Sequence, residues 1–258
     1  MITLKQFIEE LCTFPQMTTI ERKALILKHL WNTSFLCQDK GGDVVELGCS
    51  YGQTSIIIKN FIDLFCPDKQ FWVFDSFEGI LGTSDKDSNA HGHCEDGDLA
   101  SGLDKFIKTF NEFDTSLPDE ILKVDVRDIK EDEFPEKISF CYIDLDIYEP
   151  TKHVLPLVWS RLKEGGVIVI DDYYYEEVFN GVKPAVDEFL EENSISLCTH
   201  TEKNKMQSFL LDYFNNKERA GYAIAISKPA NVDTRSLEKL WFKNVCRNFT
   251  KPEIKKGV

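Results

Sequence analysis

The sequence has little basic charge and no closely paired cysteines. Lysine and arginine number 30 against 44 acidic residues, which gives a formal net charge of −14 at pH 7. Such a surface repels phosphate backbones, and no basic stripe is present, so we expect no nucleic-acid partner. The eight cysteines contain no Cys-x-x-Cys pair, and several lie inside apolar runs. This pattern favours reduced core thiols over a secreted disulfide framework.

Long apolar runs are also missing. No stretch of about 18 apolar residues occurs, so we expect no transmembrane helix. The first residues, MITLKQFIEELCTF, carry acids and lack the basic segment, apolar stretch and cleavage site of a signal peptide. We therefore expect a cytoplasmic protein without a membrane partner. The 258 residues suit one large α/β domain with additions, or two small domains.

From residue 43 the chain alternates short apolar runs with amphipathic segments. The runs DVVELG, QFWVFD, EILKVDV, ISFCYIDLD and VIVIDD have the composition of strands, and helical patterns lie between most of them. Alternating strands and helices predict a parallel sheet with helices on both faces, which is a doubly wound α/β fold. The strand-like segments ISLCTHTE, MQSFLLDYF and GYAIAIS suggest an antiparallel edge.

Helical patterns also lie at both ends of the chain. LKQFIEELCTF and ERKALILKHLWNTSFL space apolar residues at three and four, so we predict a helical cap over residues 1–40. The main domain is then 41–228, and 229–258 is a helical extension. The cap makes a homodimer reasonable. Within the main domain, EPTKHVLPLVWSRLKEGG is predicted to be one helix ending at its glycine pair, and residues 77–98 a long loop.

The first three strands end in residues that suit a cofactor. ELGCSYGQTS places Glu46 before a turn at Gly48 and Gly52, and the following helix offers free N–H groups. The pattern G-x-G-x-x-G is absent, which counts against NAD. E-x-G-x-x-x-G is instead typical of S-adenosylmethionine loops, although a plain structural turn is the alternative. Asp75 suits ribose hydroxyls, and Asp125 would lie near an adenine edge.

The next two strands end in acids. Asp144 and Asp146 follow the fourth strand, and Asp171 and Asp172 follow the fifth. If these strands are neighbours, the carboxylates converge, and a hard divalent cation such as Mg²⁺ would offset their repulsion. The strand must then break between Asp171 and Asp172, because adjacent strand residues point in opposite directions. The alternative is that these acids are solvated caps.

Two further features lie near these strand ends. The predicted loop contains His91 and His93 next to Cys94, which are too close together to suit zinc. A loop that closes over the site, with one histidine reaching the acceptor, is the more plausible role. The tyrosines at 173–175 can line a sugar or aromatic acceptor site or pack at the sheet edge.

Four segments, VVELGCSYGQTS, FWVFDSFEG, IDLDIYEPT and GGVIVIDDYYYEEVFNGVKPAVDEFL, together resemble the macrocin O-methyltransferase family. The resemblance runs from about residue 43 to 192. It implies a class I S-adenosylmethionine-dependent methyltransferase (Rossmann-like) fold and Mg²⁺-dependent methylation of sugar hydroxyls. It also implies metal ligands at Asp144, Asp171 and Asp172. The predicted cofactor residues are Glu46, Gly48, Ser50, Tyr51, Gly52, Thr54, Asp75, Ser76, Asp125 and Asp144.

One segment departs from that family. KVDVRDIKEDEFPEK stands where the family usually has a Gly-Trp-Phe-type segment with Leu-Pro, so the family's acceptor does not carry over. The sequence predicts an S-adenosylmethionine- and Mg²⁺-dependent O-methyltransferase for a sugar or sugar-containing metabolite. Asp144, Asp146, His91 and His93 are the candidate bases. Alternatives are a phosphoryl or phenolic acceptor, a metal-dependent phosphoesterase and an NAD-dependent oxidoreductase.

Overall fold

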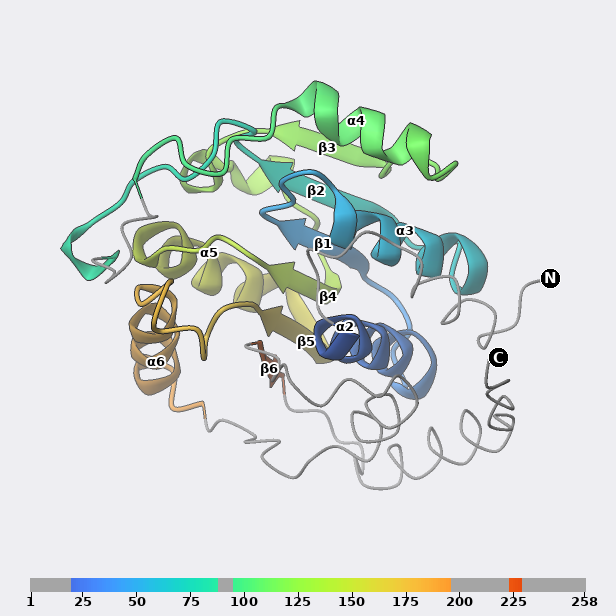
Figure 1. Ribbon diagram of the computed structural model, residues 1–258. Coiled ribbons are helices and arrows are strands. Elements are labelled where there is room, and N and C mark those ends of the chain that lie inside the picture. The colour runs from blue at the N-terminus through green and yellow to red at the C-terminus, as the bar shows by residue number, and fades with distance from the viewer. Residues whose placement is uncertain (1–19, 88–94, 196–222, 229–258) are drawn as a thin grey trace, which may run out of the picture.

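The computed structural model describes residues 20–87, 95–195 and 223–228, which form one six-stranded sheet with helices on both faces (Figure 1). The strand order is β3-β2-β1-β4-β5-β6. The first five strands run parallel, and β6 is antiparallel to β5. The predicted doubly wound sheet with an antiparallel edge is therefore confirmed.

The bounds of the elements agree with most of the sequence patterns. The strands are β1 Asp43–Leu47, β2 Phe71–Asp75, β3 Glu120–Lys123, β4 Ile138–Ile143, β5 Leu162–Ile170 and β6 Ile224–Ser227. The α-helices are α2 Ile20–Trp31, α3 Gln53–Phe65, α4 Leu103–Glu112, α5 Tyr148–Arg161 and α6 Val182–Glu192. A π-helical turn, Asn32–Leu36, follows α2, and short 3₁₀ turns span Asp85–Asp87, Val126–Asp128 and Glu131–Glu133.

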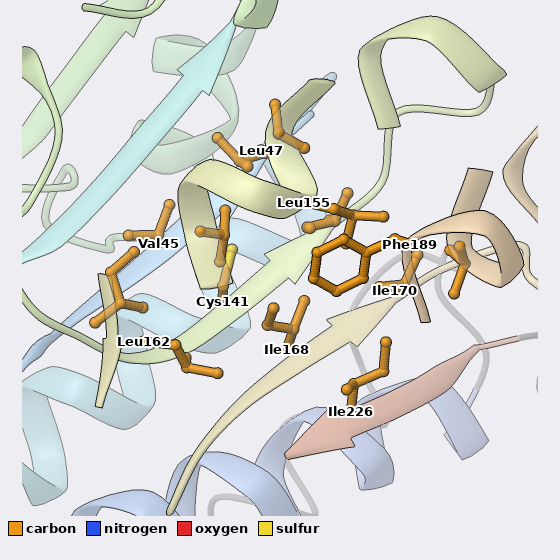
Figure 2. Packing of buried hydrophobic residues seen from close by; sticks show 14 of the residues in the cluster. Val45, Leu47, Cys141, Leu155, Leu162, Ile168, Ile170, Phe189 and Ile226 are labelled. Carbon is orange, nitrogen blue, oxygen red and sulfur yellow. The ribbon is translucent and has the colours of Figure 1, made fainter. Parts of the chain in front are cut away.

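Side chains that alternate along the strands build two cores, one on each face of the sheet. Phe140 and Tyr142 of β4 belong to the core beneath α2, α3 and α4. Cys141 and Ile143 point to the opposite face and pack with α5 and α6. Figure 2 shows this second core, in which Phe189 of α6 lies among strand residues. All of β4 is buried, as expected for a central strand with both faces covered.

The boundary between α5 and β5 differs from the prediction. The helix ends at Arg161, and the predicted terminal glycine pair lies inside β5. The cause is tertiary packing. The Leu162 side chain is buried against α5 and α6, and the Lys163 ammonium donates to the carbonyl oxygens of Thr33, at 3.0 Å, and of Asp39. Leu162 thereby pairs with Ile138 of β4, and residues 162–166 become part of β5.

Several predictions fall on residues that the structure does not describe. Of the three predicted closing strands, GYAIAIS contains β6, whereas MQSFLLDYF and all of ISLCTHTE after Ile195 lie outside the described residues. The same holds for residues 1–19, the histidines at 91 and 93, and the extension 229–258. The domain boundaries therefore stay predictions. In the part of the chain that is described, helices are too short or too polar to span a bilayer.

The strand order fixes where a ligand can bind. The chain reverses its direction of growth between β1 and β4, which are neighbours in the sheet. In doubly wound folds the crevice outside the carboxyl ends at this switch point is the usual binding site. The carboxyl ends of β1, β2, β4 and β5 all face this edge. The predicted residues are therefore brought together from distant parts of the chain.

Candidate active site

A cavity of about 440 Å³ opens at this switch point. Nearly all the predicted cofactor residues line it, namely Glu46, Gly48, Ser50, Tyr51, Thr54, Asp75, Ser76, Asp125 and Asp144. Gly52 is the exception. It has a φ of +81°, and a Cβ atom there would lie 2.8 Å from the Phe106 ring. Gly52 therefore serves the packing of α4 against the start of α3.

The turn after β1 is shaped by two contacts. Gly48 has a φ of +82°, and a Cβ atom there would lie 1.8 Å from the carbonyl oxygen of Asp144. The missing side chain thus allows the ends of β1 and β4 to touch. The backbone N–H groups of Cys49 and Ser50 donate to Asp75 Oδ2, at 2.7 and 2.9 Å. Asp75 therefore holds the turn in place from β2.

Asp75 also accepts the N–H of Phe77 on Oδ1, at 2.6 Å. Its carboxylate thus receives three backbone donors, whereas the sequence suggested ribose hydroxyls as its partners. A carboxylate has about four acceptor positions, so the donors among the described residues leave about one position for a ligand. Ribose binding by Asp75 stays a prediction.

Glu46 is fully buried in β1 and lines the cavity. Ser55 donates a short hydrogen bond to its Oε2, while Oε1 has no hydrogen-bond partner among the described residues. Burial raises the pKa of Glu46 to about 8, against the lowering effect of the Ser55 hydrogen bond. Buried polar atoms are normally paired, so this oxygen fits a ligand that brings a positively charged N–H donor.

The acids after β4 and β5 converge as predicted. Asp144, Asp171 and Asp172 each offer a carboxylate oxygen, and these oxygens all lie within 4.8 Å of one another. We call these three residues the acid cluster. β5 ends at Ile170, and Asp172 has a φ of +55°. The strand therefore ends one residue earlier than the sequence required, before Asp171, and the backbone turns at Asp172, so that both acids can reach one ion.

Three ionised carboxylates this close together repel one another, so the acid cluster requires a positive charge nearby. Burial, together with the charges of Asp171 and Asp172, raises the pKa of Asp144 well above its ordinary value. Burial, together with the charges of Asp171 and Asp146, likewise raises the pKa of Asp172 well above its ordinary value. Burial and the charge of Asp144 raise the pKa of Asp146 to about 8. A set of buried oxygen donors of this kind fits a hard divalent cation such as Mg²⁺.

Two residues that the sequence did not single out contact the acid cluster. The hydroxyl of Tyr142 donates to Asp171 Oδ2 at 2.5 Å, and its oxygen also lies 3.4 Å from Asp144 Oδ2. Arg22 of α2 places its Nε 2.7 Å from Asp171 Oδ2 and a terminal nitrogen 3.5 Å from Asp172 Oδ1. Burial alone would lower the pKa of Arg22, but the surrounding negative groups outweigh it and raise that pKa.

Apolar and aromatic side chains also line the cavity. Ile80, Leu81, Leu99, Pro150, Tyr175 and Phe179 all line it. The three consecutive tyrosines take different roles. Tyr173 is buried, with its hydroxyl donating to Asp187 at 2.6 Å, and Tyr174 is half exposed. Tyr175 lines the cavity, and its ring centroid lies 5.9 Å from that of Phe179. The third tyrosine is therefore the one of the three that lines the cavity.

Asp125 lines the cavity beyond β3 and is held by its neighbour Arg127. The guanidinium of Arg127 donates to both carboxylate oxygens, with a closest approach of 2.5 Å. This hydrogen bond is the main reason that the pKa of Asp125 is lowered. The carboxylate is thus kept ionised at the rim. Adenine recognition by Asp125 stays a prediction.

The strand order, the glycine turn and the cavity at the switch point define the fold of class I S-adenosylmethionine-dependent methyltransferases. Solved structures agree. The O-methyltransferase NovP matches with a TM-score of 0.62 at 19% identity, over 83% of this chain and 82% of NovP. The calicheamicin methyltransferase CalS11 matches with a TM-score of 0.58 at 16% identity, over 88% of this chain and 94% of CalS11.

Sequence similarity assigns the chain to one family within this fold. The profile of the macrocin-O-methyltransferase (TylF) family matches residues 17–202, and the chain belongs to this family. Mycinamicin III 3''-O-methyltransferase of Micromonospora griseorubida is 29% identical over 164 residues, which cover 60% of this chain and 63% of that protein. Demethyldecarbamoylnovobiocin O-methyltransferase of Streptomyces niveus is 26% identical, over 57% of this chain and 58% of that protein. The chain thus spans about three fifths of the length of these relatives.

Proposed function

We propose that the protein is an S-adenosylmethionine- and Mg²⁺-dependent O-methyltransferase that methylates a hydroxyl of a sugar or sugar-containing metabolite. The observation that carries the proposal is one cavity lined by Glu46, whose Oε1 has no partner in the described part of the chain, and by Asp144 and Asp172 of the acid cluster. The two features suit a cationic cofactor and a divalent ion, and family membership supports the combination. Cytoplasmic location and a homodimer belong to the proposal as expectations.

The cofactor side of the site is built from β1 and β2. Glu46 Oε1 would accept a hydrogen bond from the amino group of S-adenosylmethionine, whose sulfonium supplies an electrophilic methyl group. Asp75 keeps the turn of Ser50 and Tyr51 in position through its bonds to the backbone. Asp125 would contact the adenine edge.

The acceptor side is built from β4 and β5. Asp144, Asp171 and Asp172 would hold Mg²⁺, which when bound supplies a Lewis acid that makes an alcohol more acidic. Tyr142 orients Asp171 and Asp144 through its hydroxyl. Asp144 and Asp146 line the cavity and are candidates to take the acceptor proton. His91 and His93 remain candidates that lie outside the described residues.

The acceptor class is supported by the cavity wall and by the relatives. Tyr175 and Phe179 present aromatic side chains, which suit the apolar face of a sugar ring. A tetracenomycin-C 4'-O-methyltransferase of Streptomyces olivaceus, whose full name includes a rhamnosyl group, is 30% identical over 141 residues. That match covers 51% of this chain and 53% of that protein. A sugar hydroxyl is therefore the acceptor that we propose.

The metal role is tested with Asp171→Ala and the shape-conserving Asp171→Asn. Methyl transfer from labelled S-adenosylmethionine to a panel of glycosides is measured with and without Mg²⁺, and affinity for S-adenosylhomocysteine by calorimetry. Both variants should lose Mg²⁺-stimulated transfer. They should bind S-adenosylhomocysteine within about twofold of the wild type, a free-energy change of about 0.4 kcal/mol.

The control for this test is Asp104→Ala, which changes an exposed residue. Unchanged stimulation in both Asp171 variants would exclude the metal role. A wild type that binds no S-adenosylhomocysteine would exclude the methyltransferase itself.

A further inference from the structure

Arg22 stands out because it is a cation in an acidic cavity. Six acids line the cavity, namely Glu46, Asp75, Asp125, Asp144, Asp146 and Asp172. Among the described lining residues, Arg22 is the only lysine or arginine. It comes from α2, about 150 residues before the acids that it contacts. Its position is therefore a product of the tertiary fold and has no local sequence signal.

The contacts of Arg22 fall on two of the three proposed metal ligands. Its Nε lies 2.7 Å from Asp171 Oδ2, and a terminal nitrogen lies 3.5 Å from Asp172 Oδ1. The Arg22 side chain is 14% exposed, and those of the two acids are 0% and 6% exposed. These are buried ion pairs, which solvent and salt screen poorly. The guanidinium thus already supplies part of the positive charge that the acid cluster requires.

We infer that Arg22 is the resident counter-cation of the acid cluster and that a divalent ion must compete with it for Asp171 and Asp172. This inference rests on the proposed metal site. Two cations that share the same carboxylates repel each other, so the arginine lowers the affinity for the ion. In exchange it stabilises the metal-free protein, because Arg22 is the cation that pairs with these buried acids among the described residues. Ion binding is thereby coupled to α2.

A different role for Arg22 makes the opposite prediction. If the guanidinium only orients Asp171 for the ion, as the hydroxyl of Tyr142 does, its removal should weaken ion binding. Competition instead predicts two effects of opposite sign on removal, which are tighter ion binding and lower metal-free stability. A purely structural residue would produce the loss of stability alone. The two measurements together therefore identify the role.

The experiment uses the full chain without S-adenosylmethionine and measures Mn²⁺ binding by electron paramagnetic resonance and Mg²⁺ binding by calorimetry. Arg22→Gln should bind both ions about tenfold more tightly than the wild type, and its melting temperature should be lower without metal and rise more on addition of Mg²⁺. Arg22→Met, which keeps the aliphatic stem, is the second variant in case the first folds poorly. Arg127→Gln is the matched control, because Arg127 pairs with Asp125 of the same cavity and makes no ion pair with the acid cluster among the described residues.

The outcomes separate this inference from the proposed function. Equal or weaker ion binding by the Arg22 variants, with normal binding by the wild type, overturns the counter-cation role and leaves the metal site intact. Failure of the wild type and of every Arg22 variant to bind either ion overturns the metal site and this inference with it. Tighter binding by Arg127→Gln as well would mean that any lost positive charge has the same effect, which also overturns the specific role of Arg22.

Discussion

At the scale of single residues, Glu46 combines complete burial with an oxygen that no described residue hydrogen-bonds. A buried acid whose folded pKa lies near 8 binds a proton in the folded state between about pH 4.5 and 8, where the unfolded chain has released it. The free energy of unfolding therefore falls as pH rises through this window. One pKa unit corresponds to about 1.4 kcal/mol, so the loss is a few kcal/mol at most.

Glu46→Gln removes this titration and keeps an acceptor for Ser55. We expect the variant to lose less stability than the wild type between pH 5 and pH 8 in urea unfolding without cofactor. Its affinity for S-adenosylhomocysteine should fall about tenfold, or about 1.4 kcal/mol, because a neutral amide is a weaker partner for an ammonium group. The exposed Glu136→Gln serves as control. Parallel stability curves for the wild type and Glu46→Gln would contradict the buried-acid account.

Two neighbouring tyrosines provide a matched pair for the acceptor wall. Tyr175 lines the cavity, whereas Tyr174 is 50% exposed and is not among the lining residues. Tyr175→Ala should raise the KM for a glycoside about tenfold, through loss of an aromatic contact of roughly 1–1.5 kcal/mol, and leave S-adenosylhomocysteine affinity unchanged. Tyr174→Ala should change neither quantity. Similar kinetics for both variants would place the acceptor elsewhere.

The acids of the site were predictable from the sequence, and their cationic partner was not. Asp144, Asp171 and Asp172 follow strand patterns, so the parallel sheet alone brings them to one edge. Tyr142 lies two residues before Asp144 on the same strand face, and the alternation of β4 contained that signal. Arg22 reaches the acid cluster only because α2 packs beside β4 and β5. No spacing within the sequence encodes that contact.

At the scale of elements, Gly48 sets how closely β1 and β4 approach. Gly48→Ala would place an alanine at a left-handed φ, with its Cβ atom 1.8 Å from the backbone oxygen of Asp144. This oxygen cannot move away without separating the ends of β1 and β4. We expect this substitution to destabilise the protein by about 3 kcal/mol or more in urea unfolding.

Gly97→Ala is the comparison for this substitution. Gly97 has a φ of +93°, and nothing lies within 4 Å of the position that a Cβ atom would take there. Its alanine variant should therefore lose only the conformational term, about 1–2 kcal/mol. If the two variants were equally stable, the close approach of Gly48 to Asp144 would have no energetic weight.

The order of elements was easier to predict than their ends. Alternating apolar and amphipathic segments predicted the parallel sheet. A short apolar run indicates a strand, and apolar residues spaced at three and four indicate a helix. The end of α5 was predicted wrongly because the glycine pair was interpreted as a helix stop. Gly165 has a φ of +71°, yet the backbone around it still pairs with Lys228 after β6. Contacts with residues more than 60 positions away, at Lys228 as well as at Thr33 and Asp39, therefore set that boundary.

At the scale of the whole molecule, the negative charge of the protein and of its cavity favours a neutral acceptor over an anionic one. The net charge is −14, and six acids line the cavity with Arg22. A negative cavity repels anionic ligands, most strongly at low ionic strength. We expect a neutral glycoside to have a kcat/KM at least tenfold above that of the same sugar carried on a nucleoside diphosphate. The difference, about 1.4 kcal/mol, should shrink with added salt. Faster turnover of the nucleotide-linked sugar would contradict this expectation.

β6 adds a consequence for how the polypeptide can be shortened. The family profile ends at residue 202, whereas β6 begins at Ile224 and pairs with β5, the strand that leads into Asp171. A chain cut after residue 202 would keep every acid of the cluster and the glycine turn. It would also expose the hydrogen-bonding edge of β5 beside Ile168 and Ile170, and such an edge is a template for aggregation. The residues proposed to carry the chemistry therefore end before β6, the strand that covers the edge of β5 and protects it from self-association.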